Sequence, residues 1–156
     1  MTIYDNGRHF FEALTTTTLT ASVDLGTRRE ENGKSYIYVY NGGGASITSG
    51  YGCTVSLLSG YTVTVSSTTQ VNHCVGVANT TMATATYGWI QTKGFCKIKL
   101  SANNSMALND PIKLGTDGLF GVNSVATGNI DLQCGFAIEA VASAGSGSIY
   151  LRGLFA

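Results

Sequence analysis

The sequence contains few charged residues, and its longest charge-free stretch is its most informative feature. Only 12% of the 156 residues are Asp, Glu, Lys or Arg, against about a quarter in most soluble proteins. None of these residues occurs from Ser35 to Thr92, a run of 58 positions. Ser, Thr, Asn and Gly interrupt this run too often for a membrane-spanning helix, which needs about 18 consecutive apolar residues. A neutral surface has little charge repulsion to keep molecules apart, and this favours a structural or assembly role.

An excess of basic residues is also missing. Nine basic and nine acidic residues give a net charge of zero, whereas binding to nucleic acid requires a basic face. The same balance argues against a polybasic attachment to a membrane. We therefore expect neither nucleic acid nor a membrane as a partner. The single proline, Pro111, and the 20 glycines indicate many tight turns rather than a collagen-like or proline-rich chain.

Closely spaced cysteines are absent as well. Cys53, Cys74, Cys96 and Cys134 form no Cys-x-x-Cys pair, and the first residues do not resemble a signal peptide. We expect a protein made in the cytoplasm, with reduced thiols that serve as small hydrophobic core residues. Two disulfides, with three possible connectivities, remain the alternative.

Candidates for catalysis and metal binding are scarce. The chain has two histidines, of which His73 precedes Cys74 at the expected start of a strand, where neighbouring side chains point to opposite faces. There is no Gly-x-Ser-x-Gly or Ser-x-x-Lys motif, and no spacing typical of zinc ligands, a calcium loop or a phosphate loop. The sequence predicts no catalytic residues, no metal site, no cofactor and no enzymatic activity.

The N-terminal residues 1–34 differ from the rest of the chain. Apolar residues are scattered among polar ones, and the segment ends in the charged cluster Arg28–Glu31 and the turn Asn32-Gly33. We interpret this segment as an extended arm with apolar anchors. A first strand and loop of the main domain is an equally good interpretation.

From Tyr36 onward the pattern is one of short strands separated by glycine-containing turns. Such strands, spaced about 8–12 residues apart and without a convincing long helix, predict an all-β protein, a small β-barrel or sandwich. Ser59-Gly60 is expected to be the turn of a tight hairpin, and Lys93-Gly94 a turn between two later strands. The expected strands are 36–40, 53–58, 61–66, 71–79, 85–92, 95–100, 112–114, 134–142 and 148–154.

Three tyrosines alternate along the first of these strands. Tyr36, Tyr38 and Tyr40 should line one face, because side chains in a strand alternate between the two faces. Tyr is common in protein interfaces, and aromatic residues also cluster across strands within a sheet. We favour packing within the sheet or a contact between subunits over ligand binding.

The order of segments in the second half resembles that of a known family. The segments are Val75–Ala78, Gly88–Gly94, Cys96–Leu100, Ala107–Ile112, Asp117-Gly118, Cys134–Ala140 and Ile149–Gly153. In this order they resemble the small barrel of tailed-bacteriophage capsid decoration (cement) proteins, the class that includes the lambda decoration protein. The resemblance covers about half of the chain.

The resemblance implies a β-tulip-like barrel over residues 71–156. Residues 35–70 match no segment of that family, and their strand pattern predicts a β-hairpin region between the arm over 1–34 and the barrel. The resemblance also implies a virion protein on the capsid exterior, which stabilises the expanded head as homotrimers that bridge major capsid protein subunits. Ile3, Tyr4, Phe10 and Phe11 would contact the capsid, and Tyr36, Tyr38 and Tyr40 would form the subunit contact. The alternative is a carbohydrate-binding or adhesive module of a phage tail or fibre that uses this tyrosine face.

Overall fold

The chain folds as an all-β protein, which confirms the expected fold class. The computed structural model describes residues 3–5, 8–10, 12–55, 60–66, 74–123, 133–143 and 145–153, with the backbone alone for 3–5 and 8–10. Twelve strands and one short 3-10 turn, η1 (Thr116–Gly118), are found in these ranges. Within them, no helix has the length and apolar character needed to span a membrane.

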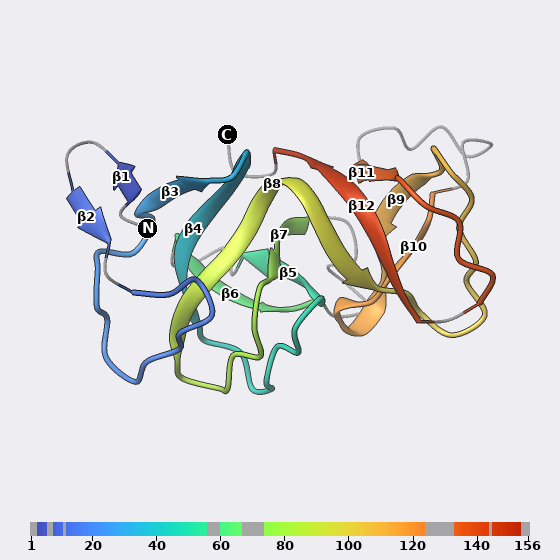
Figure 1. Cartoon of the computed structure of the whole chain (residues 1–156). Coiled ribbons are helices and arrows are strands. Elements are labelled where there is room, and N and C mark those ends of the chain that lie inside the picture. The colour runs from blue at the N-terminus through green and yellow to red at the C-terminus, as the bar shows by residue number, and fades with distance from the viewer. Residues whose placement is uncertain are drawn as a thin grey trace.

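The first half of the chain closes a five-stranded barrel (Figure 1). Its strands are β4 (Lys34–Asn41), β5 (Gly52–Val55), β6 (Thr62–Val65), β7 (Cys74–Ala78) and the beginning of β8 (Tyr87–Lys99). They pair in the order β4–β8–β7–β5–β6, and a short parallel pairing of Tyr40 and Asn41 with Thr62 and Val63 returns β6 to β4. β3 (Arg28–Glu31) pairs with the beginning of β4, and β1 (Ile3–Asp5) and β2 (Arg8–Phe10) form a separate hairpin.

The second half of the chain continues the same sheet from the end of β8. β12 (Ser146–Arg152) pairs with β8, β11 (Gln133–Ala137) with β12, β9 (Pro111–Leu114) with β11, and β10 (Phe120–Val122) with β9. The sheet curls until Leu100, just after β8, makes a parallel bridge to Phe120. The long strand β8 therefore belongs to both halves, which lie side by side in Figure 1.

Three hydrophobic clusters stabilise this arrangement. One fills the five-stranded barrel around Ile37, Val39 and Ile90, and another fills the curled second half. In the third, Tyr36, Tyr38 and Trp89 lie on the outer side of β4 and β8, against Leu14 and Val23 of the N-terminal segment. β7 contributes to both inner clusters, with Cys74 and Val77 in one and Ala78 in the other.

Most of the predicted strands are present, but residues 85–100 differ from the prediction. Lys93-Gly94 does not reverse the chain, because β8 runs without interruption through both residues. Tyr36 pairs with Gln91 whereas Ser35 pairs with Lys93, so one extra residue of β8 forms a bulge. Gly94 adopts φ +91°, a conformation that glycine adopts readily in a bulge as well as in a turn.

The organisation of the chain also differs from the predicted ranges. Residues 35–70 do not stand apart as a hairpin region, because β4, β5 and β6 close one barrel with β7 and β8. The end of the expected arm, β3, is a strand of the main sheet. The predicted hairpin of β5 and β6 is antiparallel, and Pro111 begins β9 as expected for a residue without a backbone donor.

Candidate functional site

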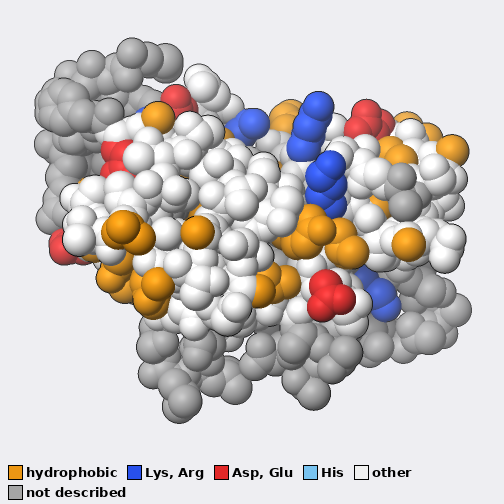
Figure 2. All heavy atoms as spheres, turned by 90° about the horizontal axis from the view of Figure 1, so that it is seen from below, with side chains coloured by type: hydrophobic (Ala, Val, Ile, Leu, Met, Phe, Trp, Pro, Cys, Tyr) orange, Lys and Arg blue, Asp and Glu red, His pale blue; other side chains and the backbone are white. Residues whose placement is uncertain are grey.

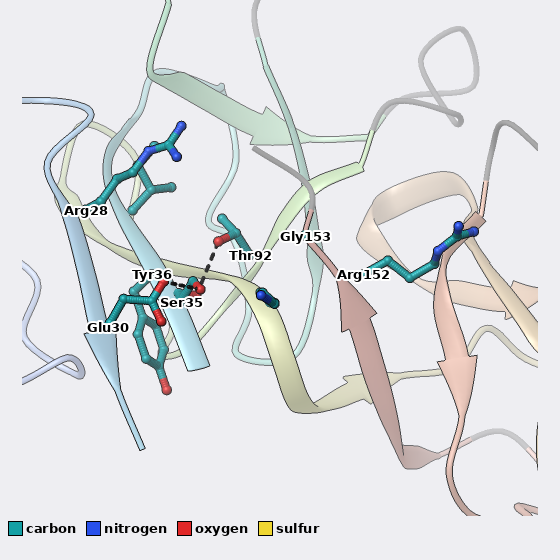
Figure 3. A pocket seen from close by; sticks show the side chains of 9 residues that line it. Arg28, Glu30, Ser35, Tyr36, Thr92, Arg152 and Gly153 are labelled. Atoms are coloured by element: carbon teal, nitrogen blue, oxygen red, sulfur yellow. Dashed lines mark hydrogen bonds between the residues drawn. The ribbon is translucent and has the colours of Figure 1, made fainter. Parts of the chain in front are cut away.

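A cavity of about 310 Å³ opens where β3, β4, β8 and β12 meet (Figure 3). Register places Arg28 opposite Ile37 and Glu30 opposite Ser35, so these four residues share one face of the β3–β4 pair. The lining residues are Arg28, Glu30, Ser35, Tyr36, Ile37, Thr92, Lys93, Arg152 and Gly153. Barrel mouths are common positions for ligand sites.

The bulge in β8 places Lys93 at this cavity. The Thr92 hydroxyl donates a hydrogen bond to the Ser35 carbonyl oxygen over 3.2 Å, on the β4 side of the bulge. On the same strand, the Gln91 side-chain amide donates to the carbonyl oxygens of Lys93 and Phe95 at 3.0 and 2.8 Å. A side chain at Gly94 would have its Cβ only 2.8 Å from the Gly33 carbonyl oxygen. Glycine at this position therefore allows the turn before β4 to approach β8.

The charges around the cavity are mainly positive. Lys93 lies directly opposite Arg152 in the β8–β12 ladder, an arrangement of like charges that destabilises a sheet. Arg28 adds a third cation, and Glu30 is the one acidic residue of the lining. In the described part of the chain, the Ser35 hydroxyl donates to Glu30, and Arg152 donates to the Gln133 side chain at 3.2 Å. No ion pair joins the lining cations to a described acidic residue.

Three aromatic residues, the exposed Phe95 and Phe136 and the half-buried Tyr150, continue from the cavity along the outer face of the sheet. Phe95 lies opposite Tyr150, and Tyr150 lies opposite Phe136. The Phe95 and Tyr150 ring centroids are 5.2 Å apart in an edge-on arrangement, and those of Tyr150 and Phe136 are 5.6 Å apart and stacked. Phe95 is 57% exposed and Phe136 37%. We call these three residues the aromatic row.

The aromatic row was not predicted from the sequence. Its three rings come from three strands that are adjacent only in the folded sheet. Each strand contributes one ring, so no single strand shows the row in its sequence. The alternation of exposed and buried residues from Lys93 to Lys99 was the available signal, since it places Phe95 between lysines on the outer face.

The tyrosines predicted to form a subunit contact lie mostly inside the chain. Tyr36 is 5% exposed and Tyr38 is fully buried, so packing within the sheet is what the structure shows for these two. Tyr38 packs 5.1 Å from Trp89, and its hydroxyl accepts hydrogen bonds from the Ser22 backbone and hydroxyl at 3.2 and 3.0 Å. Tyr40 is half-buried against Tyr87 at 4.8 Å and is the one of the three that retains surface for another subunit.

The residues predicted to contact the capsid are only partly described. Ile3 and Tyr4 belong to β1 and Phe10 to β2, where Ile3 pairs with Phe10. Their backbone is described and their side chains are not, and Phe11 lies outside the described residues. Their role as capsid contacts stays a prediction.

Neither a metal site nor a reactive thiol emerges from the described residues. Within them, no three His, Cys, Asp or Glu side chains converge to hold a metal ion, and His73 lies outside them. All four cysteines are buried free thiols. Burial raises the pKa of Cys53 and of Cys96 to about 12, and a hydrogen bond with Cys134, together with burial, raises the pKa of Cys74. These three thiols are protonated and unreactive at neutral pH. The hydrogen bond with Cys74 lowers the pKa of Cys134, whose side chain is buried.

Comparison with known proteins finds a similar fold among solved structures. No protein-family model and no curated protein matches the sequence. Among solved structures, the chain is similar to the N base of head fiber gp8.5 of bacteriophage phi29, with a TM-score of 0.55 and 10% sequence identity. The similarity covers 78% of this chain and 98% of that one. The chain thus shares the fold of the base of a phage head fiber.

Proposed function

We propose that this protein is a non-enzymatic structural component of a bacteriophage virion that binds the outer surface of the capsid. The observation that carries the proposal is the fold shared with the phi29 head fiber base over nearly all of that chain. The order of segments that resembles phage decoration proteins leads independently to the same class of protein.

The surface of the molecule supports this role. The 58-residue run without charge supplies β4 to β7 and the beginning of β8. In Figure 2, the described charged side chains are few and scattered among uncharged atoms and hydrophobic side chains. Exposed apolar residues such as Leu19, at 80%, and Leu108, at 60%, suit contacts with neighbouring proteins. A surface of this kind packs against other proteins at a low cost of charge desolvation.

Capsid attachment through the N-terminal segment is the second part of the proposal. Among the residues whose side chains are described, the hydrophobic clusters begin at Leu14, and the resemblance to decoration proteins implies that the residues before it are anchors. Ile3, Tyr4, Phe10 and Phe11 would then be available as anchors on the major capsid protein. Trimers at three-fold positions would bridge several capsid subunits, and many modest contacts would together resist internal pressure.

Imaging of the virion tests the location directly. We expect extra density on the capsid exterior that fits this fold, and virions without the protein should release their DNA at a lower temperature. A chain that lies only in the tail, or that is absent from purified virions, would overturn the proposal.

A deletion tests the attachment segment. A chain that lacks residues 1–11 should keep its unfolding temperature within a few degrees and lose binding to capsids. Light scattering on the full chain should give the mass of three 16.3-kDa chains if trimers form before attachment, and of one chain if they form on the capsid. If the truncated chain binds capsids as well as the full chain does, the attachment site lies in the barrel and not in residues 1–11.

A further inference from the structure

The outer face of the β8–β12 ladder carries a regular sequence of cations and aromatic rings. Opposite residues in the ladder share a face, so the pairs Lys93–Arg152, Phe95–Tyr150 and Lys97–Ser148 follow one another on the outer side. Successive pairs are about 7 Å apart along the strands. The cavity lies at the Lys93–Arg152 end, where Arg28 adds its charge.

These side chains do not take part in the hydrophobic clusters or in the described ion pairs of the fold. Phe95 and Phe136 are exposed rather than packed in one of the three clusters. Lys93 and Arg152 lie opposite each other in the ladder, where like charges are unfavourable, and no described acidic residue forms an ion pair with either. The Arg152 side chain extends toward β11, where it donates to Gln133 (Figure 3). An anion bound between them would relieve this repulsion, and Arg binds carboxylates particularly well through paired hydrogen bonds.

The backbone of this face has few free hydrogen-bonding groups. β12 is paired on both edges, with β8 and with β11. On the other edge of β8, the Lys93 and Phe95 carbonyl oxygens accept from the Gln91 side chain, and the Lys99 N–H donates to Gly50. A peptide therefore cannot add here as another strand, which is the usual way an extended peptide binds a sheet. A ligand of this face must be recognised by side chains alone, through charge and through contact with aromatic rings.

We propose that this face binds an acidic saccharide. A sugar carboxylate would lie between Lys93 and Arg152 at the cavity, and the apolar face of a neighbouring sugar ring would pack on Phe95 and Tyr150. Lys97 would meet the next acidic group along the chain. Sites of this type combine aromatic contact area with a few charged groups that fix orientation.

Single-stranded nucleic acid is the competing ligand, because it too binds to aromatic rings flanked by cations. The observations favour the saccharide. Nucleic-acid affinity comes mainly from many phosphate contacts, whereas this face offers a short row of cations on a chain with zero net charge. A saccharide with a carboxylate on some of its units needs fewer charges and more ring contact.

A glycan array that carries acidic and neutral glycans tests this proposal on the purified full chain, with labelled oligothymidylate as a separate probe. We expect binding confined to acidic glycans. The double variant Lys93→Gln/Arg152→Gln should weaken binding to the best of them by about tenfold or more. Phe95→Ala should weaken it by about three- to tenfold.

Matched controls separate this site from a general loss of charge or of apolar surface. Lys99→Gln removes a cation at the far end of β8 that donates to Ser146, and Leu108→Ala removes an exposed apolar side chain outside the aromatic row. Both should bind as the unchanged protein does. The absence of acidic-glycan binding, equal binding of neutral glycans, tighter binding of oligothymidylate, or equal losses in the controls would each overturn the proposal.

Discussion

The ring centroids of Tyr38 and Trp89 are 5.1 Å apart on the outer side of the barrel. At the same place, the Tyr38 hydroxyl is hydrogen-bonded to the N-terminal segment. Ser22 donates to this oxygen from its backbone and its hydroxyl, and Leu14 and Val23 pack on the same rings. A tyrosine that belongs to the barrel thereby fixes a segment of irregular structure on it.

Removal of the Tyr38 hydroxyl should loosen this segment. Tyr38→Phe leaves the ring stacking in place and takes away the acceptor of the Ser22 hydrogen bonds, which should cost about 1–2 kcal/mol of unfolding free energy. Hydrogen exchange should become faster at residues 14–27 and stay unchanged in β7 and β12. Tyr40→Phe is the matched control, since no described hydrogen bond involves its hydroxyl. Equal effects of the two substitutions would contradict this account.

Asn41 should be among the most sensitive polar positions of the fold. Its side chain is buried, and its amide nitrogen donates to the carbonyl oxygens of Ala45, Met82 and Ala83, each at 3.1 Å. After Asn41→Ala, the Met82 and Ala83 oxygens still accept from the Ile47 backbone and the Thr86 hydroxyl. The Ala45 oxygen loses this donor and the Gly43 N–H loses the Asn41 side-chain oxygen as its acceptor, so we expect a loss of about 1–3 kcal/mol in urea unfolding. The exposed Thr84→Ala nearby should change stability by less than about 0.5 kcal/mol. If Asn41→Ala lowers the free energy of unfolding by as little as Thr84→Ala does, water replaces the hydrogen bonds of the Asn41 side chain.

The bulge in β8 makes Gly94 intolerant of a side chain. Gly94 has φ +91°, and an added Cβ would lie 2.8 Å from the Gly33 carbonyl oxygen. Gly94→Ala should therefore lower the free energy of unfolding by at least about 1–3 kcal/mol. Gly44→Ala is the control, since a Cβ added at Gly44 would meet nothing within 4 Å; it should be neutral to within about 1 kcal/mol. Thermal unfolding of the two variants measures both effects. Equal unfolding temperatures for Gly94→Ala and Gly44→Ala would contradict the prediction.

The buried thiols predict a loss of stability in alkali. Burial raises the pKa of Cys53 from 9.0 to about 12 in the folded chain. Above pH 9 the unfolded chain releases this proton and the folded chain retains it, so stability is constant below about pH 9 and falls as the pH rises toward 12. The slope is up to about 1.4 kcal/mol per pH unit for each such thiol.

Urea unfolding at a series of pH values from 7 to 11 measures this slope. Cys53→Ala should be less stable at pH 7, because it leaves a cavity, and its stability should fall less steeply above pH 9. A slope that is identical with and without Cys53 would show that its pKa is not raised. The native chain should also resist thiol reagents at pH 8 until it is unfolded.

Local sequence patterns were sufficient to find most of the strands. The alternation from Tyr36 to Tyr40 predicted β4, and the apolar pairs around Ser59-Gly60 predicted the antiparallel pairing of β5 with β6. The prediction was wrong at Lys93-Gly94, because a glycine at positive φ serves a bulge as well as a turn, and the sequence does not distinguish the two. Residues 120–122 were not predicted as a strand, since β10 is only three residues long.

The candidate site was less predictable than the fold. The tyrosine face was read correctly as one face of one strand, yet nothing in its own residues shows that Leu14 and Val23 cover it. Conversely, Phe95, Tyr150 and Phe136 are separated by up to 55 positions in the sequence (150 − 95 = 55), and only the pairing of β8, β11 and β12 joins them.

The sequence by itself determined that this protein is all-β, neutral and built from short strands, because strand periodicity, turn residues and charge are local properties of the chain. The tertiary structure alone decided which aromatic faces are buried and which are open. It also decided that β8 serves both halves and that Lys93 faces Arg152. These are outcomes of strand order and register, in which the shift of a single residue in β8 changes which side chains meet, and no local pattern encodes them.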